Sequence, residues 1–225
     1  MKVKLISHSK VDANILPVAA NGYKDKDIEN LVAYCARVSN PGNQYNIETN
    51  ARLLKYLMKH KHWSPFEMVS VCMEIETTRD IARQILRHRS FSFQEFSQRY
   101  ANPSEMGEMF ELREARLQDE KNRQNSFETD DADLAAEWIR QQQKVINQAS
   151  QAYKWAISNG IAKEQARAVL PEGNTKSRMY MNGTLRSWIH YIELRRENGT
   201  QKEHMDIAKA CAKVISEIFP LMEAK

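Results

Sequence analysis

One short stretch of alternating residues most constrains how this chain of 225 residues can fold. Within residues 66–76 (FEMVSVCMEIE), the apolar residues Val69, Val71, Met73 and Ile75 stand at every second position. This period-two pattern predicts a strand with one buried face. The segments on either side repeat their apolar residues every three or four positions, which is typical of helices. A strand placed among helices predicts the α+β fold class.

The remaining elements are expected to be mostly helices, according to apolar spacing and to residues that start or stop helices. We expect helices over residues 27–38, from Leu53 to Met58 after a possible Thr49 cap, over 78–88, from about Asp133 to Ser158, over a short segment before Pro171, from about Thr184 to Arg196 and from Thr200 to Ile218, with a second strand over 174–182. Gly160 is expected to stop the long helix. Thr200 and Glu203 form the T-x-x-E pattern of a capping box.

These elements predict a single domain over residues 1–225, in which several long helices pack a small antiparallel or mixed sheet and the chains assemble as an oligomer. The charged stretch near residues 104–132 contains few apolar anchors, so we expect an exposed excursion there. Trp138 and Trp155 fall at helical spacing in the long helix and are expected to be core or subunit contacts.

The composition narrows the class of protein. Apolar residues make up 42% and charged residues 28% of the chain, which is ordinary for a globular protein, and the net charge of +4 does not by itself argue for nucleic acid or a membrane surface. No membrane span or signal peptide is evident, so we expect a cytoplasmic protein. Cys35, Cys72 and Cys211 show no CxxC spacing, which indicates neither a disulfide framework nor a zinc site.

Phosphate and metal motifs are missing from the sequence. The chain has only seven glycines, and they form neither GxGxxG nor GxxxxGK[ST], so a bound nucleotide would have to be held mainly by arginine side chains. Neither an HExxH motif nor an EF-hand loop nor an acidic cluster for magnesium occurs, so no metal is expected.

The stretch RHRSFSFQEFSQRY, residues 87–100, suggests where such arginines lie. It sets arginines and a histidine among serines and aromatic residues, without any lysine. In the helix that leads into it, Arg79, Arg83 and Arg87 stand four residues apart with Gln84 beside them, which predicts one cationic edge.

From Arg89 onward, serine and aromatic residues alternate, which predicts an extended or looped segment. Such a segment would let Arg89, Ser97 and Arg99 converge on a ligand outside the helix. Guanidinium groups bind phosphate through two parallel hydrogen bonds, and serine hydroxyls can fill the remaining acceptors, so this pattern predicts a nucleotide site. The spacing alone is equally compatible with a salt-bridged surface edge.

The same stretch resembles the R-H-R-x7-S-x-R signature of the flavin-dependent thymidylate synthases, with Arg87, His88, Arg89, Ser97 and Arg99 in register. Four further motifs resemble the family in the same order: AxRVS (Ala36 to Ser39), H-x-S-P-F-E (His62 to Glu67), ARxVLP (Ala166 to Pro171) and L-R-S-W-I-H-Y-I-x-L-R (Leu185 to Arg195). Together they cover most of the chain outside residues 104–160, and five ordered motifs are very unlike a chance match.

The resemblance implies a reaction and a set of partners. The family methylates dUMP to dTMP, takes the one-carbon unit from methylenetetrahydrofolate and takes the reducing hydride from FAD, which NADPH recharges. The resemblance also implies a homotetramer whose chains share each site, with no nucleic acid or membrane as partner. Because the flavin supplies the hydride directly, no cysteine nucleophile is expected.

The resemblance implies these sites residue by residue. The flavin set is Ser64, Arg87, His88, Arg89, Glu95, Thr184 with Gly183 or Arg186, and His190. The dUMP set is Gln84, Arg87, Glu95, Phe96, Ser97, Gln98, Arg99, Arg167 and Arg195. Two positions depart from the commoner pattern of the family, since Gln94 replaces an asparagine and His190 stands where some members carry asparagine.

Arg195 is the predicted catalytic residue. On the expected helix it shares a stripe with Trp188, Tyr191 and Ile192, so an arginine lies in an otherwise apolar row. By itself this arginine reads as a helix-end cation that reaches solvent. In the family, the arginine at this position contacts the pyrimidine, where its charge would stabilise the ionised ring.

Two other functions also fit parts of the sequence. A nucleic-acid-binding module that uses the arginine and aromatic segment would also explain the basic balance, and it predicts salt-sensitive binding without a chromophore. A nucleotide hydrolase would lack its acidic metal cluster. His8, His60 and His204 have no motif context and are expected to be surface or capping groups, whereas a role for His62 near the flavin is plausible.

Overall fold

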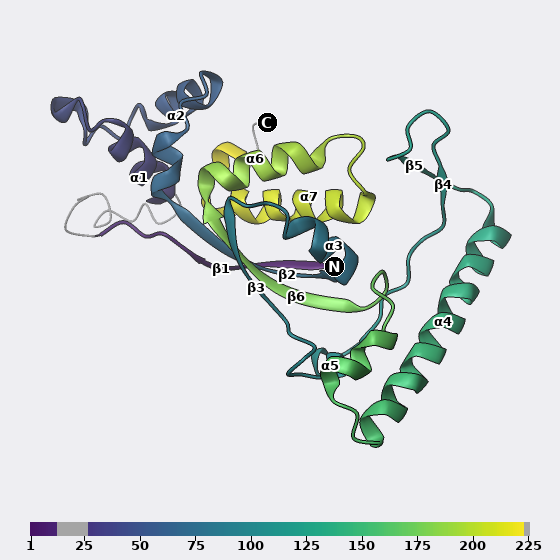
Figure 1. The fold of residues 1–225 in the computed structure, drawn as a ribbon. Coiled ribbons are helices and arrows are strands. Elements are labelled where there is room, and N and C mark those ends of the chain that lie inside the picture. Colours follow the sequence, from purple (N-terminus) through teal and green to yellow (C-terminus); the bar gives the residue numbers. More distant parts are fainter. Residues whose placement is uncertain (13–26, 223–225) are drawn as a thin grey trace.

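A four-stranded antiparallel sheet forms the centre of the protein, in the order β1-β2-β6-β3 (Figure 1). Its strands are β1 (Lys2–His8), β2 (Ser70–Thr78), β6 (Lys176–Thr184) and β3 (Phe91–Glu95). The computed structural model describes residues 1–12 and 27–222. A small antiparallel sheet packed by helices confirms the α+β class that the sequence predicts.

The central strand β2 has the buried face that its alternating residues predict. Val71, Met73 and Ile75 are fully buried, and the last two lie opposite Met181 and Met179 of β6. The strand begins four residues later than expected, because the chain after Trp63 first forms a short 3-10 helix, η4 (Ser64–Met68), with Pro65 in its first turn. Proline favours such a helical start since it lacks the backbone N–H that a strand would use.

Charged pairs across strands hold the opposite face of the sheet. Arg178 lies opposite Glu76, and their Nη2 and Oε1 atoms are 2.6 Å apart. Tyr180 donates to Glu74 Oε2 at 3.1 Å, and Lys4 Nζ approaches the other oxygen of Glu74 at 3.3 Å. Directly opposite pairs of this kind each stabilise a sheet by about 0.2–1 kcal/mol and disfavour a slip in register.

Helices α6 (Leu185–Arg196) and α7 (Lys202–Ile218) cover the apolar face of the sheet (Figure 1). Trp188 of α6 is fully buried, and its indole N–H donates to the backbone oxygen of Val71 at 2.9 Å. This bond satisfies the only donor of a large apolar side chain and thereby fixes α6 over β2. Three shorter helices are α1 (Asp27–Ala36), α2 (Asn50–Lys59) and α3 (Arg79–Ile85).

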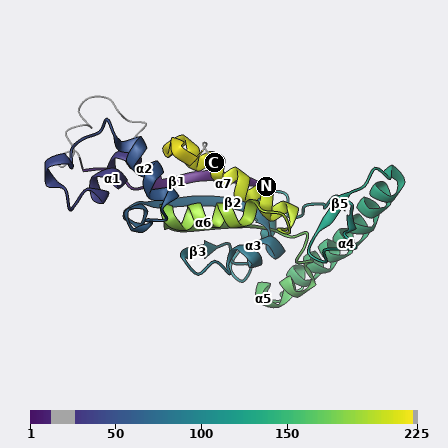
Figure 2. The same ribbon diagram turned by 90° about the horizontal axis from the view of Figure 1, so that it is seen from above.

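A long arm extends from the sheet at the end remote from α1 and α2 (Figure 2). We use this name for residues 113–169, which comprise the hairpin of β4 (Arg116–Gln118) and β5 (Ser126–Glu128), helix α4 (Ala132–Ser158) and the short α5 (Lys163–Ala166). Gly160 has a φ of +75° just after α4, as its expected role in ending the helix requires. No helix in residues 1–12 and 27–222 has both the length and the apolar character needed to span a membrane.

Arg113 joins the arm to the rest of the protein. Its Nη2 lies 2.8 Å from Asp80 Oδ1, its Nη1 lies 2.9 Å from Glu203 Oε1, and its Nε donates to the backbone oxygen of Gly173 at 3.3 Å. Its backbone N–H donates to Gln142 Oε1 of α4 at 2.8 Å. The excursion expected near residues 104–132 is largely exposed, but this partly buried anchor was not foreseen from the sequence.

The expected capping box at the start of α7 is wrong. The helix begins at Lys202 with Gln201 as its N-cap residue, and no side chain caps it. Glu203 turns its carboxylate toward Arg113 instead of toward the backbone at Thr200. A partly buried guanidinium offers the carboxylate a stronger, charge-assisted bond than a backbone N–H does.

The end of α2 contains a strained residue that yields a stability prediction. Lys61 has a φ of +60°, and the bonds from His62 N to Leu57 O (2.8 Å) and from Lys61 N to Met58 O (3.2 Å) form a Schellman motif. A residue with a Cβ atom in this left-handed region is strained by about 1–2 kcal/mol relative to glycine. Glycine removes this strain but loses more backbone entropy on folding, so the net gain in stability is smaller. We therefore expect Lys61→Gly to raise the free energy of unfolding by about 0.5–1 kcal/mol in urea titrations.

Lys59→Gly is the matched control, because Lys59 lies in the last helical turn with ordinary helix geometry. This change should lower the free energy of unfolding by about 0.5–1 kcal/mol. Loss of stability in both variants would show that Lys61 is not strained.

Candidate active site

One face of α6 carries the R-H-R segment. Ser187 Oγ donates to the backbone oxygen of Ser90 at 3.3 Å, and the ring of Tyr191 meets that of His88 edge-on at 4.9 Å between centroids. One turn further, Arg195 Nε donates to His88 Nε2 at 2.9 Å. Positions 187, 191 and 195 are four apart, so a single helical stripe brings two distant sequence motifs together.

The bond from Arg195 fixes the state of the His88 ring. An arginine can only donate, so His88 Nε2 is the acceptor and the ring proton lies on Nδ1. Burial, together with the charges of Arg195 and Arg87, lowers the pKa of His88 to about 4. At pH 7 this imidazole is therefore neutral, and its Nδ1–H is the donor that remains for a ligand.

A second stripe of α6 faces η4 and its neighbours. Arg186 forms a salt bridge with Glu67, and the ring of His190 meets that of Trp63 at 4.7 Å between centroids. Thr184 caps α6 by accepting a hydrogen bond from Ser187 N at 3.2 Å. Helix α6 thus contacts both η4 and the R-H-R segment, each through its own stripe, and Ser64 is exposed at the start of η4.

Gly183 is the exception within that set, because packing occupies it. It lies buried opposite Phe91 in the sheet register, and a Cβ atom there would overlap with the Phe91 ring. The missing side chain lets Phe91 reach Trp188, at 4.9 Å between ring centroids.

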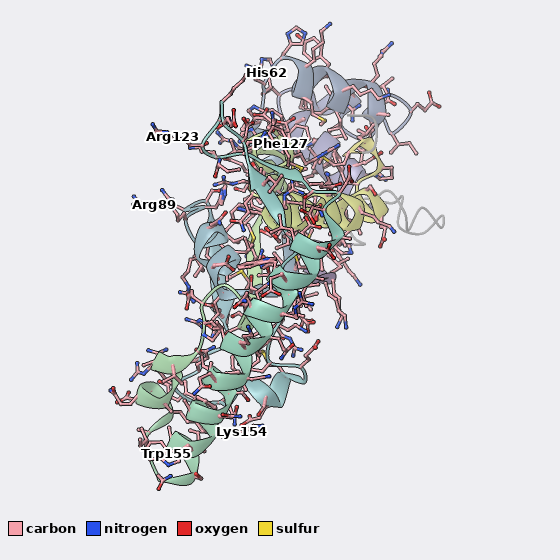
Figure 3. The ribbon with its side chains drawn as sticks, turned by 90° about the vertical axis from the view of Figure 1, so that its right-hand side faces the viewer. His62, Arg89, Arg123, Phe127, Lys154 and Trp155 are labelled. Carbon is pink, nitrogen blue, oxygen red and sulfur yellow. The ribbon has the colours of Figure 1, made fainter. Side chains whose placement is uncertain are left out.

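The expected cationic edge of α3 is largely neutralised. Arg83 Nη2 lies 2.7 Å from Glu95 Oε2, and Arg79 Nε lies 3.2 Å from Glu172 Oε2. Arg87 and Arg89 are exposed and form no salt bridge within the described ranges. In Figure 3 the side chain of Arg89 points away from the protein. Arg87, at the end of the predicted cationic edge, and Arg89, just beyond it, are therefore the arginines of this segment that can bind an anion.

The second group of predicted residues follows β3. Glu95 accepts hydrogen bonds from Arg83 and from Ser177 Oγ at 2.7 Å, so it orders the strand end. Gln98 is 3% exposed, and its Nε2 donates to no residue in the described part of the chain. A buried amide donor without a partner is costly and points to a ligand that accepts from it.

Arg99 and Arg167 meet at α5. Arg99 Nε lies 3.5 Å from Glu164 Oε2, while Arg167 Nε donates to the backbone oxygen of Glu164 at 3.3 Å. Phe96 continues the pairing of β3 by donating to the backbone oxygen of Arg178 at 2.8 Å. Ser97 is half-buried between these residues.

The two groups of predicted residues do not converge within one chain. Arg89 precedes β3 and Arg99 follows it, and a strand of five residues is about 16 Å long. The alternating serines and aromatics form β3, which confirms the extended segment expected from the sequence. Because Arg89 and Arg99 stand at opposite ends of this strand, the predicted convergence of Arg89, Ser97 and Arg99 on one small ligand would need residues from more than one chain.

His204 was expected at the surface, but it is fully buried. Its Nδ1 lies 3.2 Å from Gln84 Oε1 and its Nε2 lies 3.1 Å from the hydroxyl of Tyr191. The sequence does contain a signal for this burial. Positions 204, 207, 208, 211 and 215 fall on one helical stripe, and the structure buries all five.

A cavity of about 1260 Å³ lies between the arm and the start of α7. None of the predicted site residues lines it. Its charges balance, since five basic and five acidic side chains face it: Arg113, Arg116, Arg123, Lys202, Lys209, Asp80, Glu114, Glu128, Glu203 and Asp206. The cavity therefore has no excess of positive charge that would favour a phosphate.

The cysteines and possible metal ligands add no further chemistry to the site. Burial raises the pKa of the thiols of Cys35, Cys72 and Cys211, which is the opposite of what activates a cysteine nucleophile. Within residues 1–12 and 27–222, no three or more histidine, cysteine or acidic side chains are grouped so that they could hold a metal ion.

Comparisons with known proteins agree on one family. The family model described as thymidylate synthase complementing protein matches residues 22–221. A probable flavin-dependent thymidylate synthase of Paramecium bursaria Chlorella virus 1 is 52% identical over 192 residues, covering 85% of this chain and 87% of that protein. A flavin-dependent thymidylate synthase of Synechocystis is 51% identical over 197 residues, covering 87% and 88%.

A solved structure supports the same conclusion. The UMP/dUMP methylase PolB from Streptomyces cacaoi, bound with 5-Br dUMP, is similar with a TM-score of 0.77 at 25% identity, covering 99% of this chain and 93% of that one. The expected resemblance is confirmed, because one family model matches nearly the whole chain and the arrangement around α6 brings the family's motifs together. The chain belongs to the thymidylate synthase complementing protein family, the flavin-dependent thymidylate synthases.

Proposed function

We propose that this protein methylates dUMP to dTMP, with methylenetetrahydrofolate as the one-carbon donor, FAD as the cofactor and NADPH as the reductant. The observation that carries the proposal is the bond from Arg195 Nε to His88 Nε2, which joins two motifs of the family beside Arg87 and Arg89, two arginines without a salt bridge to any described residue. The methylase activity of the similar PolB structure and the names of the relatives support it.

The residues of the candidate site fit a flavin dinucleotide. Arg87 and Arg89 can hold its phosphates, which agrees with the lack of a glycine-rich phosphate loop. The neutral His88 offers its Nδ1–H, while Ser64, Glu95, Thr184, Arg186 and His190 complete the proposed set. When bound, the flavin would supply the hydride that reduces the transferred one-carbon unit to a methyl group, after its own reduction by NADPH.

The substrate dUMP would use the remaining groups. The proposed contacts are Gln84, Arg87, Glu95, Phe96, Ser97, Gln98, Arg99, Arg167 and Arg195. Arg99 and Arg167 suit the phosphate, and the unpaired amide of Gln98 suits a further acceptor of the nucleotide. Arg195 is the proposed catalytic residue, because a guanidinium at the pyrimidine stabilises the negative charge that makes its ring carbon nucleophilic.

The proposed assembly is a homotetramer in which two chains build each site. A separation of about 16 Å between the residue groups at the two ends of β3 supports this, since one uracil nucleotide would then draw one group from each chain. Exposed apolar side chains along α4, among them Trp138, Val145 and Trp155, support an interface there. Figure 3 shows Trp155 near the far end of the arm.

The first test of the proposal is the colour of the purified protein. We expect it to be yellow and to release FAD on denaturation. Arg87→Gln and Arg89→Gln should each weaken FAD binding about tenfold or more, because a charge-assisted bond contributes about 1.5–3 kcal/mol. Fluorescence titration of the apoprotein with FAD measures this loss.

Arg140→Gln serves as the control, because Arg140 is an exposed arginine of α4 whose ion pair in the described part of the chain is with a neighbour on the same helix, Glu137. This variant should bind FAD as the wild type does. Colourless protein that cannot be reconstituted with FAD, or an equal loss in all three variants, would contradict the proposed flavin site.

The second test follows the reaction itself. Protein incubated with dUMP, methylenetetrahydrofolate and NADPH should yield dTMP, and omission of any one of the three should abolish it. Sedimentation analysis should give a mass about four times that of the chain. A protein that binds polynucleotides in a salt-sensitive manner and forms no dTMP would instead support the nucleic-acid-binding alternative.

A further inference from the structure

A chain of hydrogen bonds runs between α6, α7 and the end of α3. Tyr191 Oη lies 3.1 Å from His204 Nε2, and His204 Nδ1 lies 3.2 Å from Gln84 Oε1. Gln84 Nε2 donates to Gln201 Oε1 at 2.7 Å, and Gln201 Nε2 donates to Glu203 Oε2 at 2.9 Å. The chain ties Gln84 to His204, which lies outside all five family motifs.

The carboxylate of Glu203 determines which group donates and which accepts in every hydrogen bond of this chain. It can only accept, so Gln201 donates to it through Nε2 and accepts from Gln84 through Oε1. Gln84 Oε1 carries no hydrogen, so His204 Nδ1 must hold the ring proton. His204 Nε2 is then free of hydrogen and accepts from the hydroxyl of Tyr191.

The surroundings of His204 agree with this neutral form. The side chain is fully buried, and the rings of Tyr191 and His88 lie 5.7 Å and 6.2 Å from it between centroids. Burial, the charge of Arg195 and the neighbouring His88 lower the pKa of His204 to about 3. A neutral imidazole offers one donor and one acceptor, which is what the chain requires.

We propose that His204 is a positioning residue for the pyrimidine nucleotide, which acts by holding the side-chain amide of Gln84 in one orientation. A rotation of that amide by 180° would place two oxygens against each other at Gln201, and at His204 it would place two donors against each other unless the ring changed to its other tautomer. The second hydrogen of Gln84 Nε2 is thus the donor left for an acceptor on the substrate. The inference rests on the proposed function, since it takes Gln84 as a contact of dUMP.

A double-mutant cycle on dUMP binding tests the inference. His204→Leu keeps most of the volume but removes both polar atoms, and we expect it to raise the Kd for dUMP about tenfold in calorimetric titration. If His204 acts through Gln84, the same substitution in a Gln84→Met background should change the Kd less than about twofold. Equal effects in the two backgrounds would overturn the positioning role.

Two further variants separate positioning from stability. His204→Asn places an amide N–H near the position of Nδ1, so the Kd for dUMP should return to within about threefold of the wild type. Ile207→Val, at a buried position on the same stripe of α7, should lower the free energy of unfolding but leave the Kd unchanged. A purely structural role would weaken dUMP binding in Ile207→Val as well, and His204→Asn would fail to rescue it.

Nuclear magnetic resonance of protein labelled with ¹⁵N-histidine tests the tautomer without any ligand. The resonances of His204, assigned by their loss in His204→Leu, should show a neutral ring protonated on Nδ1 at pH 7.5. A ring protonated on Nε2, or on both nitrogens, would overturn the inference. Wild-type protein that binds no dUMP would contradict both proposals, whereas active wild type with an additive cycle would contradict the role of His204 alone.

Discussion

Arg195→Lys is expected to lower turnover by a factor on the order of 10²–10³, the loss seen when one preorganised donor to a developing oxyanion is removed. Arg195 uses Nε to hold His88 at 2.9 Å, which leaves its Nη groups for the pyrimidine. Lysine carries one compact charge and cannot make both contacts. The measurement is the stopped-flow oxidation of pre-reduced flavin at saturating dUMP with methylenetetrahydrofolate.

Arg196→Lys is the matched control, because Arg196 is an exposed arginine in the same last turn of α6. It should turn over at the wild-type rate, and both variants should retain FAD. Equal oxidation rates and equal dTMP yields for Arg195→Lys and the wild type would show that Arg195 only complements the helix end.

Arg113→Ala is expected to lower the free energy of unfolding by about 3 kcal/mol, because it leaves the partners of a largely buried guanidinium unpaired. The side chains of Arg113 and Glu203 are 14% and 15% exposed, but Asp80 is 31% exposed, so the loss should fall short of that for a fully buried pair. Urea titration measures the loss, and hydrogen exchange should rise most in the arm.

The loss in Arg113→Ala should depend on pH. Burial raises the pKa of Glu203, but its bonds and charge attraction with Arg113 outweigh this and lower the net pKa. In the wild type this stabilisation is present above the unfolded pKa of about 4.3 and is lost as pH falls. Without Arg113, burial is opposed only by the weaker hydrogen bonds from Gln201 and the backbone of Glu203, so the difference between variant and wild type should be largest near pH 7 and shrink below about pH 4.

Two controls accompany this prediction. Arg140→Ala breaks an exposed pair within one helix and should change stability by no more than about 0.5 kcal/mol. Arg113→Ala should also cost less in a Glu203→Gln background, because the carboxylate left unpaired is then absent. An equal cost in both backgrounds would mean that Arg113 stabilises the arm by packing alone.

Several local features of this protein could be predicted from the sequence alone, although the capping box of α7 could not. The alternation around Val71, Met73 and Ile75 predicted β2, and the spacing of α6 predicted that Tyr191 and Arg195 share one stripe, although not that this stripe faces the R-H-R segment. Periodicity succeeds here because neighbours on a strand or helix are separated by a fixed number of residues. The family motifs predicted the enzyme class for a related reason, since each motif is a local pattern of residues.

Only the tertiary structure decided which distant residues meet. Whether an arginine stays free depends on carboxylates far along the chain, as when Glu172 pairs with Arg79. His204 was misjudged because its partners Gln84 and Tyr191 come from two other helices, and no local spacing relates the three. Long-range packing, which buries polar groups only where they find partners, therefore determined the geometry of the site.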